Sequence, residues 1–191
     1  MKSNFSYKDI YVEDYSSSIS ELDSIIEKTQ PDLVFINSKG DALVNYKVSQ
    51  IIDFIKPKGL KVRLISNGYI LSREEFIKIA NKCDEIIGEI KAITEEDFKK
   101  LQRPIEGYTL EDYIENMVSF NKQYNGKFIF EITIIKKYND DEESFQKIKD
   151  IIKRINPDEI EIVRIDNERM KKTLWVDDEK FEEIKRELMN I

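Results

Sequence analysis

The feature that most constrains this sequence is a strict alternation between short β-branched runs and amphipathic helical patterns. The runs are rich in isoleucine and valine and are bounded by turn residues, as buried strands are. The predicted strands are residues 33–36, 62–65, 85–90, 128–135 and 159–163. Such alternation predicts an α/β protein whose strands pair in parallel through right-handed helical crossovers.

Between the predicted strands, hydrophobic residues recur at spacings of three and four, which places them on one face of a helix. These stripes begin at Ile19, Val48, Phe76, Leu110, Ile148 and Phe181. The strands are too few for a closed eight-stranded barrel, so residues 1–191 are expected to form one domain, either an open doubly wound sheet or a partial barrel. In both folds, ligands bind at the carboxyl ends of the strands.

Several helix starts carry local signals. Ser18-x-x-Glu21 and Ser72-x-x-Glu75 predict capping boxes, and Thr94-x-x-Asp97 and Thr109-x-x-Asp112 predict weaker ones. Asn139-Asp140 is expected to cap the helix that begins near residue 141.

Composition excludes several classes of chemistry. The chain has no histidine, which removes Ser-His-Asp and Cys-His catalysis and zinc sites of the Cys/His type. Its one cysteine, Cys83, cannot form a disulfide within the chain, so a cytoplasmic location is expected. The first residues hold no apolar run, so no secretory signal is expected.

Charge and hydropathy argue against nucleic acids and membranes as partners. The net charge of −7 argues against non-specific nucleic-acid binding, which depends on neutralising phosphates. The short basic segment 169–172 is interpreted as a solvated loop. No apolar run approaches the ~20 residues that a membrane-spanning helix needs, so no membrane association is predicted.

Polar and glycine-containing segments follow the predicted strands, where a fold of this kind binds its ligands. Taken singly, they are also ordinary turns, because Gly40 and Gly68 can supply a positive φ angle. None of them matches a phosphate loop or a G-x-G-x-x-G fingerprint. The segments are Ser38–Leu43, Ser66-Asn67-Gly68, Lys91-Ala92 and Asn139–Glu143.

The order of these segments resembles the radical S-adenosylmethionine (radical SAM) superfamily, in particular the Fe–S oxidoreductases related to wyosine and molybdenum-cofactor enzymes. Ser38–Leu43 is similar to an eroded Gly-Gly-Glu-Pro turn of that family, and Ser66-Asn67-Gly68 to its Thr-Asn-Gly. The family's Ser-Leu-Asp-Ala strand end is similar to Glu89–Ala92, and the Asn-Arg-Pro that follows it is similar to Gln102-Arg103-Pro104. The family's Asn-Asp-x-Glu-Glu turn is similar to Asn139–Glu143. The resemblance spans about residues 18–165. It implies a partial (βα) barrel with about five parallel strands and outer helices.

The same resemblance implies a cofactor site at the strand ends, and SAM is the cofactor that the family would bring to it. Asp41 stands where the family offers a glutamate-containing pocket to the methionyl amine. Lys91 reverses the charge of the residue that would face the ribose. The residues expected to bind a retained cofactor are Ser38, Gly40, Asp41, Ser66, Asn67, Gly68, Lys91, Arg103 and Asn139.

The departures from the family bear on function. The cluster-binding C-x-x-x-C-x-x-C loop is absent, and Cys83 precedes a different strand. Three thiolates are needed to hold the cluster, so no [4Fe–4S] cluster is expected from this chain alone. The absent cysteines and Lys91 favour a degenerate, non-catalytic domain that acts as a binding or partner protein.

Two other interpretations stay open. In one, the chain is a truncated or split radical SAM oxidoreductase whose cluster loop comes from a missing N-terminal segment or another chain. In the other, it is a metal-dependent enzyme that uses Asp41, Glu89 and Glu131, although no spacing specifies a metal site.

Two expectations concern partners. Lys39, Lys91, Arg103 and Arg164 either converge at the strand ends, where they would bind a small anionic ligand, or form separate ion pairs, which is slightly favoured. A partial barrel also leaves strand 33–36 as an open edge, and open edges invite pairing. A homodimer or a partner protein is therefore expected at this edge, unless residues 5–15 cover it.

Overall fold

The core of the protein is one parallel β-sheet. The computed structural model describes residues 15–38, 40–45, 47–165 and 167–190. The predicted strands are confirmed, each to within one residue at either end. They are β1 (Leu33–Ile36), β2 (Lys61–Ser66), β3 (Glu85–Ile90), β4 (Lys127–Ile134) and β5 (Glu159–Arg164).

The strands pair in chain order, β1-β2-β3-β4-β5, and every pair is parallel. A doubly wound sheet would reverse its strand order at a switch point, and this sheet does not. Sequential order with crossovers of one hand keeps the connecting helices on one side of the sheet. The fold is therefore a partial barrel, as expected.

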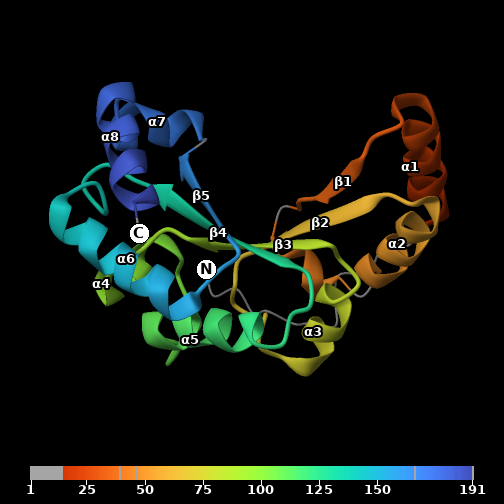
Figure 1. The fold of residues 1–191 in the computed structure, drawn as a ribbon, viewed down its shortest axis with the longest axis horizontal. Coiled ribbons are helices and arrows are strands. Elements are labelled where there is room, and N and C mark those ends of the chain that lie inside the picture. Colours follow the sequence, from red (N-terminus) through yellow and green to blue (C-terminus); the bar gives the residue numbers. More distant parts are fainter. Residues whose placement is uncertain (1–14, 39, 46, 166, 191) are drawn as a thin grey trace.

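The helices follow the curve of the sheet. In Figure 1, α2, α3, α5 and α6 line the outer side, while α1 lies beyond β1 at one end and α7 and α8 stand beside β5 at the other. The concave side carries no described helix. The bounds are α1 Ser16–Thr29, α2 Val48–Ile55, α3 Glu74–Ala80, α4 Glu95–Leu101, α5 Leu110–Asn121, α6 Glu142–Ile155, α7 Glu168–Leu174 and α8 Asp178–Met189, with 3₁₀ turns η1 (Ala42–Val44) and η2 (Lys56–Lys58).

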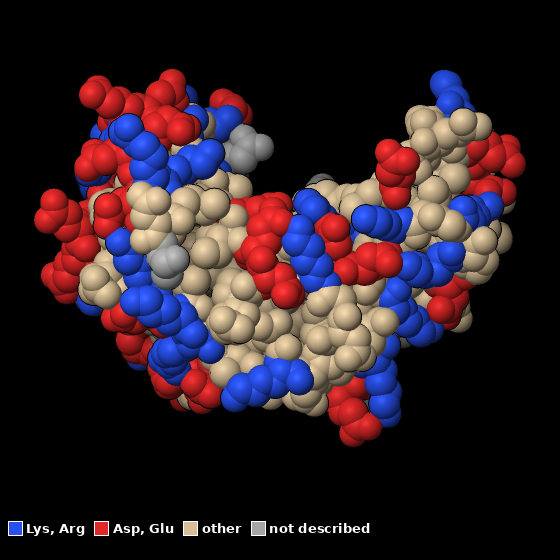
Figure 2. Space-filling view, in the orientation of Figure 1, with Lys and Arg blue, Asp and Glu red and all other residues tan. Residues whose placement is uncertain are grey.

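The hydrophobic core fills the space between the outer face of the sheet and these helices. Side chains alternate between the two faces of a strand, so Phe128, Phe130 and Ile132 of β4 are fully buried in this core. Glu131 and Lys127 of the same strand lie on the concave face and are partly exposed. Charged side chains of both signs gather in this concavity (Figure 2).

The helix starts only partly match the local signals. Thr109 forms the predicted capping box with Asp112, and Thr94 accepts a hydrogen bond from the Asp97 backbone. The predictions at Ser18 and Ser72 are wrong, because α1 already begins at Ser16 and α3 begins two residues after Ser72. Across the described residues, no helix is both long enough and apolar enough to cross a membrane.

Candidate functional site

The loop after β1 is built around a buried carboxylate. Ser38 donates a hydrogen bond to the carbonyl of Gly40 (2.9 Å), whose φ of 143° lies in the region that favours glycine. Asp41 then caps the 3₁₀ turn η1 by accepting a hydrogen bond from the Leu43 N–H (3.0 Å). The Asp41 side chain is thereby turned inward, and the residue is only 7% exposed.

Asp41 also binds the end of β2. Its Oδ2 accepts hydrogen bonds from the Ser66 hydroxyl (2.6 Å) and from the Asn67 N–H (3.0 Å). Burial raises the pKa of Asp41, and the hydrogen bonds from Ser66, Leu43 and Asn67 offset part of that rise. Both carboxylate oxygens are therefore occupied by groups of the protein itself.

Tyr113 of α5 holds the ends of β2 and β3 together. Its hydroxyl lies within hydrogen-bonding distance of the carbonyl oxygens of Asn67 and Glu89, and complete burial raises its pKa well above the usual value. Gly68, at φ 83°, passes so close that an added Cβ would lie 3.0 Å from the Tyr113 ring. The sequence placed Tyr113 only in a hydrophobic stripe, although a buried tyrosine hydroxyl needs a polar partner.

A cavity of about 230 Å³, here called the strand-end cavity, opens beside Tyr113. Its polar wall includes Lys91, whose ammonium lies 2.6 Å from the carboxylate of Glu89. The other wall is largely aromatic and aliphatic, as in sites that bind small organic molecules. The lining residues are Asn67, Tyr69, Glu89, Lys91, Phe98, Leu101, Gln102, Pro104 and Tyr113.

Asn139 is a structural tie rather than a helix cap. Its Oδ1 accepts a hydrogen bond from the Ile135 N–H (2.7 Å), and its Nδ2 donates to the carbonyls of Thr133 (2.9 Å) and Lys91 (3.3 Å). The cap of α6 is Asp141, so the prediction that Asn139-Asp140 would provide it is wrong. Asn139 joins the ends of β3 and β4 behind the cavity.

Of the four predicted cationic residues, two are engaged elsewhere in the structure, Lys91 with Glu89 and Arg164 with Asp178. Lys39 lies outside the described residues, Lys91 is paired with Glu89, and Arg103 is exposed with a φ of 48°. Arg164 lies between the rings of Trp175 and Phe181, 4.1 and 4.4 Å from their centroids, and pairs with Asp178 at 2.5 Å. The interpretation as separate ion pairs is confirmed for Lys91 and Arg164.

Four of the expected site residues are joined by one hydrogen-bond network at the ends of β1 and β2. They are Asp41, Ser66, Asn67 and Gly68. Asn67 and Lys91 also line the strand-end cavity. Ser38, Gly40, Arg103 and Asn139 are not among its lining residues.

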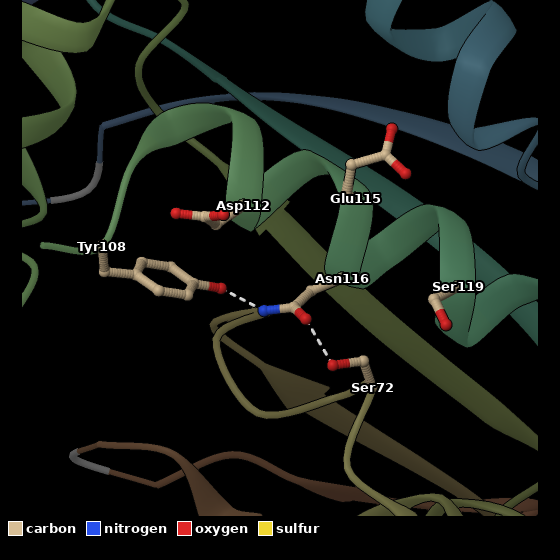
Figure 3. A pocket seen from close by; sticks show the side chains of 6 residues that line it. All are labelled: Ser72, Tyr108, Asp112, Glu115, Asn116 and Ser119. Carbon is tan, nitrogen blue, oxygen red and sulfur yellow. Dashed lines mark hydrogen bonds between the residues drawn. The ribbon is translucent and has the colours of Figure 1, made fainter.

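A second, larger depression of about 640 Å³ lies on the outer surface, along α5 (Figure 3). It is centred on Asn116, whose amide oxygen accepts from the Ser72 hydroxyl and whose amide nitrogen donates to Tyr108 and to the Tyr69 carbonyl. The depression is shallow, and Asn116 at its centre is already hydrogen-bonded to Ser72 and Tyr108. We therefore place the candidate site in the strand-end cavity.

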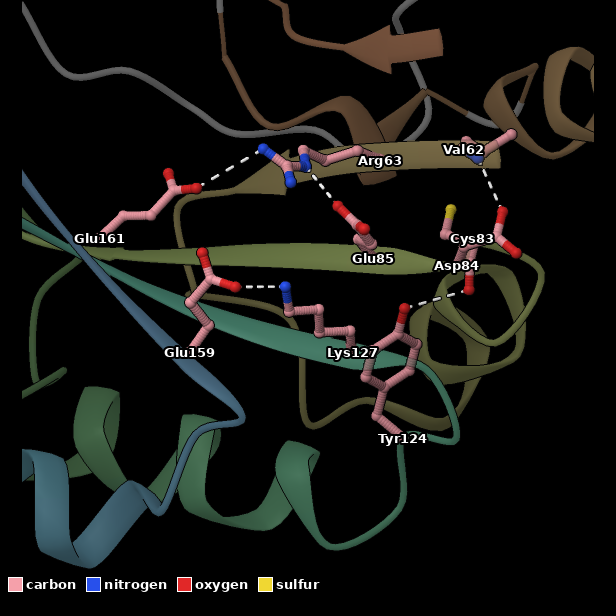
Figure 4. Close-up of polar contacts among 9 residues, drawn as sticks. All are labelled: Val62, Arg63, Cys83, Asp84, Glu85, Tyr124, Lys127, Glu159 and Glu161. Atoms are coloured by element: carbon pink, nitrogen blue, oxygen red, sulfur yellow. Dashed lines mark hydrogen bonds and ion pairs between the residues drawn. The ribbon is translucent and has the colours of Figure 1, made fainter. Parts of the chain in front are cut away.

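The opposite, amino-terminal ends of the strands are held by aspartates. Asp84 accepts hydrogen bonds from the Val62 N–H (2.7 Å) and from Lys56 (2.7 Å), and Asp158 accepts one from the Phe128 N–H (2.7 Å). Each aspartate thus joins the start of one strand to its neighbour. The contact of Asp84 with the Val62 N–H is drawn in Figure 4.

Cys83 lies at this amino-terminal end, directly before Asp84. It is 5% exposed, and burial, followed by the neighbouring Asp84 charge, raises the pKa of its thiol to about 12. Its carbonyl accepts a hydrogen bond from Tyr124 (3.0 Å). The thiol is therefore remote in the fold from the strand-end cavity.

Among the described residues, no group of three or more Asp, Glu, Cys or His side chains has an arrangement that could hold a metal ion. In particular, Asp41 is engaged with Ser66 and does not form a ligand set with Glu89 and Glu131.

No protein-family model matches the sequence. The chain is 26% identical over 140 residues to a UPF0026 protein of Helicobacter pylori J99 and 21% identical over 145 residues to one of Methanocaldococcus jannaschii. These matches cover 72% and 76% of this chain but 45% of each relative. The chain is also 26% identical over 145 residues to GTPase Obg of Brachyspira hyodysenteriae, covering 74% of this chain and 20% of that protein. It thus spans less than half the length of these curated relatives.

Solved structures of radical SAM enzymes share the fold. TYW1 with a lysine–pyruvate adduct superposes with a TM-score of 0.62 at 15% identity, covering 91% of this chain and 58% of that one. A radical SAM methyltransferase from Sphaerobacter thermophilus gives 0.66 at 11% identity, covering 90% and 53%. A domain of a pyruvate-formate lyase-activating enzyme from Bacteroides vulgatus gives 0.62 at 13% identity, covering 82% and 92%. The chain has a radical SAM-related fold, as the resemblance implied.

Proposed function

We propose that this chain is a non-catalytic member of the radical SAM-related folds that works by binding, with a small-molecule site in the strand-end cavity. On its own it does not generate radicals. The observation that carries the proposal is the state of Asp41, because the carboxylate expected to receive the methionyl amine of SAM is buried and already accepts three hydrogen bonds, from Ser66, Asn67 and Leu43. A SAM ammonium would have to displace these donors.

The number and position of cysteines in the chain support the same proposal. A [4Fe–4S] cluster that cleaves SAM is held by three thiolates. The chain has one cysteine, whose thiol is buried at the amino-terminal end of the sheet with a pKa raised to about 12. Three thiolates would have to come from elsewhere.

The cavity suggests what kind of molecule binds. Aromatic and aliphatic side chains accommodate an apolar body, and Lys91 offers a cation at the polar wall. Because Lys91 is already paired with Glu89, a ligand with an anionic group would bind by competing with the Glu89 carboxylate.

Calorimetric titration with SAM tests the proposal, together with anaerobic incubation of the chain with ferrous iron, sulfide, a reductant and SAM. We expect no heat of micromolar binding and no 5′-deoxyadenosine from the chain alone. Formation of 5′-deoxyadenosine would overturn the proposal.

For the strand-end cavity, inorganic phosphate serves as an anionic probe. Lys91→Met should abolish the thermal stabilisation of the protein by phosphate. Lys99→Met, which removes an exposed lysine paired with Glu95, should not.

Partner binding is a second part of the proposal. Among the described residues β1 has one neighbour, β2, and Phe35 of β1 is 47% exposed. Such an edge can add a strand from another chain. Sedimentation velocity over a hundredfold concentration range should show a homodimer. A monomer at every concentration would overturn homodimerisation at this edge and leave a different partner as the remaining form of the proposal.

One observation favours the alternative, a split or truncated enzyme. The chain covers 45% of the UPF0026 relatives and 53–58% of two radical SAM structures that it matches. A cluster loop in the remaining part would complete the active site. An in-frame cysteine triplet upstream of the codon for Met1, followed by SAM cleavage when that segment is co-expressed, would establish this alternative. Micromolar binding of SAM to the present chain would favour it too.

A further inference from the structure

Three glutamates stand side by side on the concave face of the sheet. Glu89 of β3 is in register with Glu131 of β4, and Glu131 is in register with Glu161 of β5. Neighbouring strands are roughly 4.8 Å apart, so these side chains lie within direct electrostatic reach of one another. We refer to Glu89, Glu131 and Glu161 as the glutamate row.

The two outer members of the row have cationic partners. Glu89 pairs with Lys91 at 2.6 Å and also lies 3.3 Å from the Thr133 hydroxyl. Glu161 faces Arg63 of β2 at 3.5 Å, and that guanidinium binds Glu85 more closely, at 2.5 Å (Figure 4).

The central member, Glu131, makes no ion pair or hydrogen bond with any other residue that the structure describes. It is partly buried, and the charged groups that face it are Glu89 and Lys91 from the β3 side and Glu161 from β5. Burial, then repulsion by Glu89 and by Glu161, raises the pKa of Glu131 to about 7, and Lys91 offsets part of that rise. Two like charges beside a partly buried carboxyl therefore make its ionised form costly.

We propose that the glutamate row is a pH-sensitive switch in which Glu131 binds a proton below neutrality, and that release of this proton draws the Lys91 ammonium toward Glu131 and weakens its pair with Glu89. With Glu131 protonated, the row holds two carboxylates, each facing one cation. With Glu131 ionised, three carboxylates share the same two cations. Lys91 is then attracted by both Glu89 and Glu131.

The consequence reaches the strand-end cavity, because Glu89 and Lys91 form its polar wall. At low pH their ion pair is closed. Above neutrality Lys91 is shared between Glu89 and Glu131, so the Glu89 carboxylate at the cavity wall is less neutralised. This inference concerns the apo chain and does not depend on which ligand the cavity binds.

Carbon-13 NMR titration of the glutamate side-chain carboxyls between pH 4 and 9 tests the switch in the whole chain. We expect one carboxyl with a midpoint about 7, absent from Glu131→Gln, and a change in the Lys91 side-chain signals with the same midpoint. Glu161→Gln should lower the midpoint of Glu131 by removing a repulsive neighbour, whereas Glu182→Gln, an exposed position on α8, should leave it unchanged.

Two results would overturn the proposal. If every glutamate titrates below pH 5.5, the row does not hold a proton near neutrality. If Lys91 shows no transition at the midpoint of Glu131, the proton is not coupled to the cavity. Should Glu131→Gln fail to fold, the wild-type titration and the shift in Glu161→Gln still decide the outcome.

Discussion

The carboxylate of Asp41 accepts a hydrogen bond from the hydroxyl of Ser66 at 2.6 Å, across the gap between the first and second strand ends. The two residues are 25 positions apart in the sequence. In the resemblance to radical SAM enzymes, both belong to motifs that would handle a cofactor. Here they bind each other, so the contact stabilises the carboxyl ends of β1 and β2 in the partial barrel.

Asp41→Ala should destabilise the protein substantially. The substitution leaves the Ser66 hydroxyl and the N–H groups of Leu43 and Asn67 without their acceptor. Buried donors without partners are costly, so the free energy of unfolding should fall by about 2–4 kcal/mol. Urea denaturation measures this change. Asp23→Ala, which breaks the exposed pair with Lys58, should cost less than about 1 kcal/mol; equal losses in the two variants would contradict the role of Asp41.

Asp84→Asn should destabilise the protein in a pH-dependent way. Burial alone would raise the pKa of Asp84, but the hydrogen bonds from Lys56 and the Val62 N–H outweigh it and lower the pKa. A lowered pKa means that the ionised group stabilises the fold above the unfolded-state pKa and that this stabilisation is lost as the pH falls through the folded-state pKa. At pH 7 the variant should lose about 1–2 kcal/mol of unfolding free energy.

The same comparison at low pH supplies the control. In urea titrations repeated below pH 4, the difference between wild type and Asp84→Asn should shrink, because Asp84 then becomes protonated. A difference that stays constant from pH 7 to pH 3 would show that the charge of Asp84 is not what stabilises the strand start.

Cys83 should be inert in the native protein. With a thiol pKa of about 12, its thiolate is on the order of a thousandfold scarcer at pH 8 than that of an ordinary cysteine. We expect negligible reaction with a disulfide reagent such as DTNB under native conditions and one equivalent of reaction in guanidinium chloride. Rapid reaction of the folded protein would contradict the burial of Cys83.

Gly88→Ala should strain the core. A Cβ at this position would lie 2.8 Å from the ring of Phe128 and 3.3 Å from the sulfur of Met117. Overpacking of this kind costs about 1–3 kcal/mol of unfolding free energy. Phe128→Leu makes room, so the double variant should lose less than the sum of the two single losses. Strict additivity in urea denaturation would show that the ring and the new methyl group do not collide.

The strands were predictable because their signal is local. Runs of isoleucine and valine between turn residues mark each strand within its own few residues, and the alternation with helical stripes restricts the topology. Thr109 was predictable as a cap for the same reason, since its partner Asp112 is three residues away.

The failures arise from contacts between distant parts of the chain. Ser72 carries a capping pattern, but its hydroxyl is bound by Asn116, which is 44 residues further on. Arg164 was a candidate for an anion site, yet Trp175, directly after α7, and Phe181 of α8 enclose it. Asn139 resembled a cap and instead joins two strand ends. A sequence pattern does not reveal which long-range partner a polar side chain will find.

The order in which the strands pair has a consequence for how the protein forms. Each of β2 to β5 hydrogen-bonds to the strand before it in the chain, so none of them must wait for a segment made much later. Pairing between neighbouring units carries a smaller loop-closure cost than pairing between distant parts of the chain would. Each strand–helix unit can therefore dock on the preceding one while the ribosome is still making the next, and β5 is the last strand to gain its neighbour.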